Sequence, residues 1–475
     1  MRATRVGRWT GITVAGVMCA TLGAATRPAS RDETPTAVAT PEGAALRADP
    51  RLEDPQPCSD SVGFTCSYLT VPLDRHGGAP GSLRLRVATA DNAAAPRGTL
   101  LLLTGGPGQA GASLLPRLRE RFSYLLDGYR LVMIDQRGTG AGALTCEALQ
   151  AEVGTSDVTA PTPEAVRECA RLLGANRGLY TTADTVADLE DLRQALSVSQ
   201  WTLDGVSYGS FVAQQYGLTF PDRVHRMVLD SVVPQDGPDA LYAASLRRTG
   251  WMLRQACQEQ GCGFDPAAAL ADVVRRYGND VGVFDLIVAA SIVDPKLTGA
   301  GFFPVLKLLR KAAQGDPAPL NDAIAELQDG DGARPDRYSA GLHLATLCAD
   351  LIHTPWGDST TPLRQRDPAI DQTVRRLRTD QVWPFEPRTT TGHGVVRGCR
   401  HWPPARPNPR PPHPHLAMPV LLINGDRDLS TPLEWAVEQT ARTPHGRLVT
   451  IPGMGHSIQG RNPVGDQAVR GFLLS

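Results

Sequence analysis

Lysine is nearly missing from this 475-residue chain, which holds only Lys296, Lys307 and Lys311 beside many arginines. No run of basic residues occurs, and the formal net charge is −1. Nucleic-acid binding needs a basic patch or stripe, so we expect no nucleic-acid partner. We read the preference for arginine as the mark of a GC-rich genome rather than of chemistry.

Long apolar runs are missing as well, and the N-terminal one, at 12–22, is short for a bilayer span. It follows an arginine-containing start and precedes small residues, an order typical of a secretory signal peptide cut near Ala25. We therefore predict a signal peptide over residues 1–25, secretion to the outside of the cell or to the cell wall, and no integral membrane segment afterwards. Lipidation at Cys19 is the alternative, although Met18 stands where a lipobox needs a small residue.

No two cysteines are spaced Cys-x-x-Cys, which argues against a thiolate metal site. Nine cysteines occur, so removal of a signal peptide with Cys19 would leave eight, an even number. Because exported proteins meet an oxidising compartment, we expect disulfides, although eight cysteines can pair in many ways. Closeness in sequence favours the pairs Cys58–Cys66 and Cys257–Cys262. Cys146–Cys169 can close a further loop, and Cys348–Cys399 then follows by elimination.

The first part of the chain alternates between strand-like and helix-like segments. Residues 26–55 lack periodicity and read as a flexible lead. Short apolar runs bounded by glycine follow, at 98–106 and 129–138 for example, as is typical of buried parallel strands. Because helical stretches separate these runs, we predict an α/β fold with a mostly parallel sheet covered by helices, whose first part spans 56–234.

The alternation stops after Pro234 and returns only near the end of the chain. Residues 235–400 are mostly helical in pattern, and we predict that they form a large lid inserted before the last core strands. The last part of the core would then span 401–475. Its first residues, 401–415, are rich in proline and histidine, and we interpret them as a solvated crossing rather than a metal-binding tract.

A Gly-x-Ser-x-Gly motif surrounds Ser207, between an apolar run and a helix-like run. In a nucleophile elbow, the serine occupies a strained strand-to-helix turn that exposes its hydroxyl above the sheet. Such a short motif also recurs by chance, and an ordinary turn serine is the alternative. Its context therefore decides whether Ser207 is a nucleophile.

A serine nucleophile needs a base, and the base needs an orienting acid, in the chain order Ser, Asp or Glu, His. His456 follows the apolar run at 447–451 in a glycine-flanked loop, and Asp426 and Asp428 follow the run at 418–425. We favour Asp428 as the acid because it lies farther out on its loop. Asp230, after another predicted strand, is a third candidate. A loop histidine with no catalytic role is the alternative for His456.

Two backbone N–H groups must stabilise the oxyanion. The residue after the nucleophile, Tyr208, supplies one, and the glycine-rich loop at 104–111 can supply the other from Gly106, with Gly105 second. A phosphate-binding loop is excluded because no Lys-Ser or Lys-Thr follows the glycines.

These segments resemble the proline iminopeptidase group of α/β-hydrolases, and most closely its secreted tripeptidyl aminopeptidase branch. The matching segments are GGPG at 105–108, DQRGTG at 135–140, GVSYGS at 205–210, GDRDLSTP at 425–432 and GMGH at 453–456. The resemblance covers most of the mature chain, whereas the lid matches only loosely. Thr104 departs from the histidine of the iminopeptidases, and Asp204 before the elbow is also unusual.

The resemblance implies an α/β-hydrolase fold and an exopeptidase that releases short units, such as di- or tripeptides, from peptides with a free N-terminus. It implies neither a cofactor nor a metal. The charged α-amine needs a carboxylate in the lid, and Asp350 and Glu386 are the candidates, with a structural ion pair as the alternative for each. A carboxylesterase or lipase would use the same triad, whereas a non-enzymatic binding protein would need a broken one.

Overall fold

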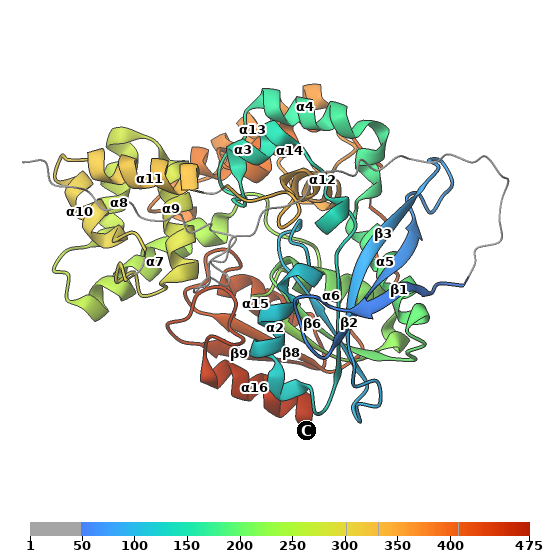
Figure 1. Ribbon diagram of the computed structural model, residues 1–475. Coiled ribbons are helices and arrows are strands. Elements are labelled where there is room, and N and C mark those ends of the chain that lie inside the picture. Colours follow the sequence, from blue (N-terminus) through green and yellow to red (C-terminus); the bar gives the residue numbers. More distant parts are fainter. Residues whose placement is uncertain (1–48, 301, 331, 407) are drawn as a thin grey trace, which may run out of the picture.

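The computed structural model describes residues 49–475 except 301, 331 and 407 (Figure 1). The predicted signal peptide, Cys19 and most of the predicted lead lie outside the described residues. Within the described part of the chain, no helix combines the length and the apolar character needed to cross a membrane.

A single sheet of nine strands forms the centre of the molecule, in the order β1-β2-β3-β5-β4-β6-β7-β8-β9. The strands are β1 (Leu52–Pro57), β2 (Phe64–Pro72), β3 (Ser82–Ala90), β4 (Thr99–Leu103), β5 (Arg130–Ile134), β6 (Trp201–Val206), β7 (Val224–Asp230), β8 (Val420–Gly425) and β9 (Gly446–Ile451). The first three are antiparallel to their neighbours, and the other six are parallel to one another. The predicted mostly parallel sheet is confirmed.

The sheet begins earlier than the sequence pattern indicates. The predicted flexible lead extends to residue 55, but β1 already pairs with β2 from Leu52, which lies opposite Leu69. Most residues of β1 are exposed, so the strand shows none of the apolar alternation by which a half-buried strand is recognised. Pairing with β2 alone creates this edge strand.

Helices cover both faces of the sheet. Leu101 and Leu103 of β4 face one apolar layer, and Leu100 and Leu102 face the other. This is why the strand reads as a continuous apolar run. The first layer includes α5 (Thr182–Ala195), α6 (Tyr208–Thr219) and α15 (Leu433–Ala441), and the second includes α2 (Leu115–Arg121) and α16 (Pro463–Leu474).

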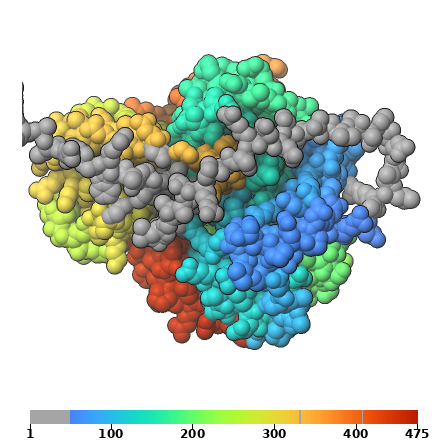
Figure 2. Space-filling view, in the orientation of Figure 1, coloured from blue at the N-terminus to red at the C-terminus, as the bar shows by residue number. Residues whose placement is uncertain are grey.

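The segment between β7 and β8 is helical and stands above the carboxyl ends of the parallel strands, separate from the sheet layers (Figure 1). We call its residues 235–400 the lid. Its helices are α7 (Ala243–Gln260), α8 (Pro266–Tyr277), α9 (Asp280–Val293), α10 (Val305–Ala313), α11 (Ala318–Gly330), α12 (Ala340–Asp350), α13 (Leu363–Arg376) and α14 (Gly394–His401). In Figure 2 the yellow and orange lid lies over the red C-terminal part of the core.

A second excursion from the core joins the lid. Helices α3 (Glu147–Val153) and α4 (Pro163–Leu173) come from between β5 and β6, yet they pack on α12 and α14. Leu149 and Val166 share one apolar cluster with Leu344 of α12 and Phe284 of α9. The lid therefore has a core of its own, built from two separate parts of the sequence.

Four disulfides join the predicted cysteine pairs. Cys146–Cys169 links α3 to α4, and Cys348–Cys399 links α12 to α14. Cys58–Cys66 and Cys257–Cys262 close short loops.

Candidate active site

Ser207 lies at the sharp turn between β6 and α6, with φ 58° and ψ −126°. A non-glycine residue rarely adopts such a conformation, which costs on the order of 1–3 kcal/mol. The flanking glycines permit the turn: a Cβ on Gly205 would lie 2.2 Å from the carbonyl oxygen of Gly209, and one on Gly209 would lie 2.3 Å from that of Leu103. These contacts are the steric reason for the Gly-x-Ser-x-Gly motif.

Asp428 and His456 form a buried hydrogen-bonded pair. The Nδ1 of His456 lies 2.8 Å from Oδ2 of Asp428. The other oxygen of this carboxylate accepts the backbone N–H groups of Ser430 and Thr431, both at 2.9 Å, and the hydroxyl of Thr431 donates to Oδ2 at 2.7 Å. The acid is therefore held in place by its own loop, and it orients the imidazole.

Burial and charge act in opposite directions on this pair. Burial alone would raise the pKa of Asp428, but the positive charge and the N–H of His456 lower it below its ordinary value. Burial alone would likewise lower the pKa of His456, but the Asp428 carboxylate raises it above its ordinary value. Within the pair, an ionised carboxylate thus stabilises the charged form of the imidazole.

Asp426, the second candidate for the acid, has a different partner. Its Oδ1 accepts the backbone N–H of Gly453 at 2.7 Å, which ties the end of β8 to the loop after β9. Burial raises the pKa of its carboxyl group. The structure thus brings Asp428, and not Asp426, to His456.

Asp230, the third candidate, joins two loops of the site. Its carboxylate accepts the backbone N–H groups of Ile458 and Gln459 at 2.9–3.0 Å, two and three residues after His456. Its backbone carbonyl accepts the N–H of Ser207 at 2.9 Å. One residue at the end of β7 therefore holds the serine turn and the histidine loop side by side.

The glycine-rich segment 104–111, here called the oxyanion loop, lies next to Ser207. A Cβ on Gly105 would lie 3.1 Å from Cβ of Ser207, so the backbone passes close to the serine. The N–H of Gly105 donates to the side-chain oxygen of Gln109 at 3.3 Å, whereas Gly106 lines the cavity above Ser207. Gly106 is thus the better-placed partner for the amide of Tyr208, the first residue of α6.

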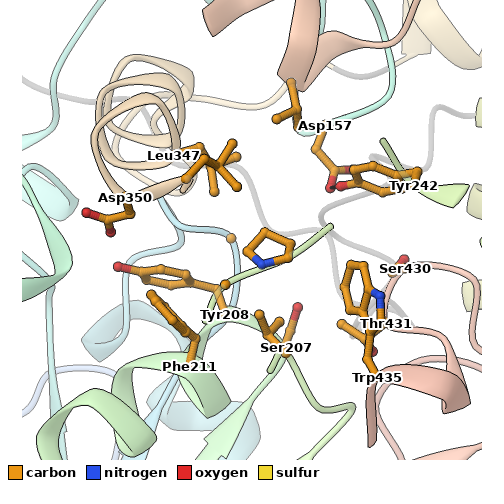
Figure 3. A pocket seen from close by; sticks show the side chains of 16 residues that line it. Asp157, Ser207, Tyr208, Phe211, Tyr242, Leu347, Asp350, Ser430, Thr431 and Trp435 are labelled. Atoms are coloured by element: carbon orange, nitrogen blue, oxygen red, sulfur yellow. Dashed lines mark hydrogen bonds between the residues drawn. The ribbon is translucent and has the colours of Figure 1, made fainter. Parts of the chain in front are cut away.

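A cavity opens above Ser207 (Figure 3). Apolar and aromatic side chains form most of its wall, as is usual for small-molecule sites. They include Phe211, Tyr242, Leu347 and Trp435. Two carboxylates lie on opposite sides, Asp350 beside Tyr208 and Asp157 beside Tyr242.

The carboxylate of Asp350 is already held by three donors. The backbone N–H of Thr182 lies 3.1 Å from it, the Thr182 hydroxyl donates to it, and Nδ2 of Asn408 lies 2.7 Å from it. Burial raises the pKa of this carboxyl group to about 7. Asp350 thus lines the cavity as predicted, but much of its hydrogen-bonding capacity is used within the protein.

Glu386, the second predicted amine ligand, does not line this cavity. It precedes the short helix at Pro387–Thr391 and pairs with Arg388 at 3.3 Å, with about a third of its side chain exposed. Its local ion pair corresponds to the structural alternative. Glu386 is therefore not among the residues that line the cavity above Ser207, and its role as an amine ligand stays a prediction.

Asp157 was not predicted. It lies in the loop between α3 and α4, and its carboxylate accepts the hydroxyl of Tyr242. It is half-buried and lines both this cavity and a neighbouring one. No sequence signal marks the residue, because only the packing of α3 and α4 on the lid carries it to the site.

Among the described residues, one cluster has the ligand types and spacing for a metal ion: Cys58, Asp60 and Cys66. Both of its sulfurs are joined in a disulfide, so they do not serve as thiolate ligands. It also lies outside the cavity above Ser207.

Two family models match the chain. One, described as the alpha/beta hydrolase fold, matches residues 98–278, and the other, described as TAP-like protein, matches residues 384–475. Among curated proteins, a tripeptidyl aminopeptidase of Streptomyces lividans is 28% identical over 86% of this chain and 81% of its own length. The serine protease Hip1 of Mycobacterium tuberculosis is 27% identical over 91% of each chain.

A shorter similarity reaches the proline iminopeptidase of Xylella fastidiosa, which is 31% identical over 28% of this chain and 32% of its own length. The long alignments extend through both parts of the core and the lid. Together with the sheet topology and the elbow at Ser207, they show a serine hydrolase with the α/β-hydrolase fold, similar over most of its length to tripeptidyl aminopeptidases.

Proposed function

We propose that the protein is a serine aminopeptidase that releases di- or tripeptides from peptides with a free N-terminus. The hydrogen-bonded pair of Asp428 and His456 carries the proposal, together with the strained turn of Ser207, because Asp230 is bonded both to that turn and to the loop of His456. The names of the relatives support the peptide substrate. The predicted signal peptide and the four disulfides support an exported enzyme.

The proposed mechanism is acyl transfer. Ser207 attacks the carbonyl carbon of the scissile bond while His456 takes its proton, and Asp428 stabilises the resulting imidazolium. The N–H groups of Tyr208 and Gly106 hold the oxyanion. His456 then protonates the departing amine, and a water molecule hydrolyses the acyl-enzyme with His456 as the base. None of these steps requires a cofactor.

The substrate amine needs an anionic partner within the cavity. Asp157 is the better candidate of the two carboxylates there, because among the described residues it accepts only the hydroxyl of Tyr242, whereas Asp350 accepts three donors. Residues of the lid and of the core line the cavity together.

An ester hydrolase with the same triad is the second candidate, favoured by the largely apolar wall of the cavity. A panel of chromogenic substrates separates the two functions: free-amine mono-, di- and tripeptides, their acetylated counterparts, and short-chain esters. We expect the free-amine peptides to react at least about tenfold faster than the acetylated ones, because a charge-assisted hydrogen bond contributes roughly 1.5–3 kcal/mol.

Three variants complete this test. Ser207→Ala should lose activity on every substrate by a factor on the order of 10⁴ to 10⁶. Asp157→Asn should slow only free-amine peptides, and Asp350→Asn is its matched comparison from the opposite wall. Equal rates for free and acetylated peptides in the parent would reject the aminopeptidase and leave the esterase.

A further inference from the structure

The oxyanion loop is held by the lid rather than by the core alone. The lid segment 337–343 runs beside it: the N–H of Ala110 donates to the carbonyl of Arg337 at 3.1 Å, and the N–H of Ser339 donates to the carbonyl of Gly108 at 2.9 Å. Gln109 and Tyr338 form an isolated β-bridge between the two. A Cβ on Gly108 would lie 2.6 Å from the carbonyl oxygen of Ser339, so the contact requires glycine.

His343 makes the contact closest to the candidate oxyanion donor. Its Nδ1 lies 2.9 Å from the carbonyl oxygen of Pro107, the residue after Gly106. The hydroxyl of Tyr338 lies 2.8 Å from the same nitrogen. Because a carbonyl oxygen can only accept, the contact with Pro107 is a hydrogen bond only when the proton of the neutral imidazole is on Nδ1.

The other ring nitrogen shows that apolar packing alone does not explain a histidine at this position of the lid. His343 is buried, and its Nε2 has no hydrogen-bond partner among the described residues. An unpaired buried acceptor costs free energy, whereas a leucine at this position would carry no such cost. Burial also lowers the pKa of His343, which keeps the ring neutral. The Nδ1–H contact is thus the feature that a histidine supplies here.

The two ends of the Gly106 segment are therefore tied separately. On one side the N–H of Gly105 donates to Gln109, and on the other the carbonyl of Pro107 accepts from His343. Helix α12 is itself fixed to its surroundings, since Ser339 caps it and donates to the carbonyl of Leu144, and Cys348 is bonded to α14. A rigid lid helix thus determines where the oxyanion loop lies.

We propose that His343 is a positioning residue: by donating Nδ1–H to the carbonyl of Pro107, it lets lid helix α12 set the N–H of Gly106 for the oxyanion. The inference rests on the proposed serine mechanism. It also means that the lid, besides enclosing the substrate, completes the catalytic machinery of the core. Even a small displacement of such a donor should lower kcat, because removal of one oxyanion donor lowers kcat by a factor of about 10² to 10³.

The test compares three replacements of His343. Asparagine can place an amide N–H near the position of Nδ1, whereas glutamine places it too far out and leucine has none. For His343→Gln and His343→Leu we expect kcat on a free-amine peptide to fall about 10- to 100-fold with KM little changed. His343→Asn should keep kcat within about threefold of the parent.

A second readout separates positioning from a general loss of structure. A peptide aldehyde forms a tetrahedral adduct with the serine and uses the oxyanion hole, whereas the released product peptide does not. The glutamine and leucine variants should bind the aldehyde more weakly by the factor lost in kcat, with unchanged product affinity. Thr346→Val, which removes a buried hydrogen bond from the same helix to the carbonyl of Tyr180, should lower only the melting temperature.

A third measurement needs no variant. In the parent protein with ¹⁵N-labelled histidine, NMR should find the Nδ1–H tautomer at His343. An Nε2–H tautomer, unchanged kcat in all three variants, or equal losses in all three including asparagine would each overturn the proposal. If the parent itself does not hydrolyse free-amine peptides through Ser207, the proposed function fails instead, and this outcome is recognised before any variant is compared.

Discussion

At the scale of single residues, the hydrogen-bond partners of each carboxylate in the site decide which role it can take. Asp426 and Asp428 are two positions apart on one loop, yet the first accepts the backbone N–H of Gly453 and the second meets His456. Asp428 is fully buried and Asp426 only half-buried, but burial alone does not assign the acid. The position of His456 does, because only one of the two can reach its Nδ1.

This difference predicts unequal effects of two matched substitutions. Asp428→Asn should lower kcat/KM by a factor on the order of 10⁴, because the imidazole loses both its favoured tautomer and the stabilisation of its charged form. Asp426→Asn keeps an acceptor for the N–H of Gly453 and should cost less than about tenfold. Steady-state kinetics on one peptide substrate, with melting curves for both variants, would decide. Comparable losses would show that the acid is not Asp428 alone.

The pH profile tests the role of Asp230. His456 acts as a base only when neutral, so kcat/KM should fall as the pH drops through its pKa. Burial lowers this pKa, but the carboxylates of Asp428 and Asp230 raise it, and the net shift is upward from 6.5. Asp230→Asn removes one negative charge and should therefore move the acidic limb of the profile to lower pH. An unchanged acidic limb of the kcat/KM profile would show that Asp230 only holds the loops in place and does not affect the pKa of His456.

At the scale of elements, α12 connects the parts of the molecule. It supplies Leu347 and Asp350 to the cavity, His343 to the oxyanion loop and Cys348 to the disulfide with α14. Its amino end meets α3, since the N–H of Ala340 donates to the side chain of Gln150. A change in the position of this helix would therefore reach substrate binding and oxyanion stabilisation together.

The disulfide at α12 should accordingly stabilise the chain more than a short one. Cys348 and Cys399 are 51 positions apart, and Cys58 and Cys66 are 8 apart. In the chain-entropy model, loss of the long-range bridge costs roughly 4 kcal/mol and loss of the short one roughly 2.5 kcal/mol. Denaturant unfolding of the two double-serine variants measures the difference. A larger loss from the short bridge would contradict this account.

At the scale of the whole molecule, burial raises the pKa of several carboxyl groups. Asp204, on β6 beneath the nucleophile, accepts Nε2 of Gln459 at 2.9 Å, while its other oxygen has no partner among the described residues. Burial raises the pKa of Asp204 to about 7, as it does for Asp350. Between about pH 4 and pH 7, these carboxyl groups therefore stay largely protonated in the folded protein, whereas the same groups in the unfolded chain have lost the proton.

The sign of the resulting pH dependence follows. Since their pKa is higher in the folded state, their contribution to stability is fully present below the ordinary value of 3.8 and declines until the pH passes about 7. We expect the parent to unfold more easily at pH 8 than at pH 5. Asp204→Asn should reduce this difference by raising stability at pH 8.

Denaturant unfolding at the two pH values measures the effect, with Asp222→Asn as an exposed control that should leave the difference unchanged. An Asp204→Asn protein as sensitive to pH as the parent would show that this group does not carry the dependence.

Local patterns in the sequence determined much of the core. Runs of apolar residues bounded by glycine specify buried strands because both faces of a parallel sheet exclude water. The backbone of the turn at Ser207 leaves no room for a Cβ on Gly205 or Gly209, so a five-residue motif is enough to predict the elbow. His456 and Asp428 are recognisable because chain order and strand ends are themselves local features.

Only the tertiary structure decided how the lid takes part in the site. The sequence around Asp157 and His343 predicts neither a substrate ligand nor a contact with the oxyanion loop. Conversely, the sequence favoured Glu386 as much as Asp350 as an amine ligand, but Glu386 does not line the cavity. Their roles depend on how α3, α4 and α12 pack across distant parts of the chain. Such packing is set by the summed burial of many side chains, and no short stretch of sequence contains that sum.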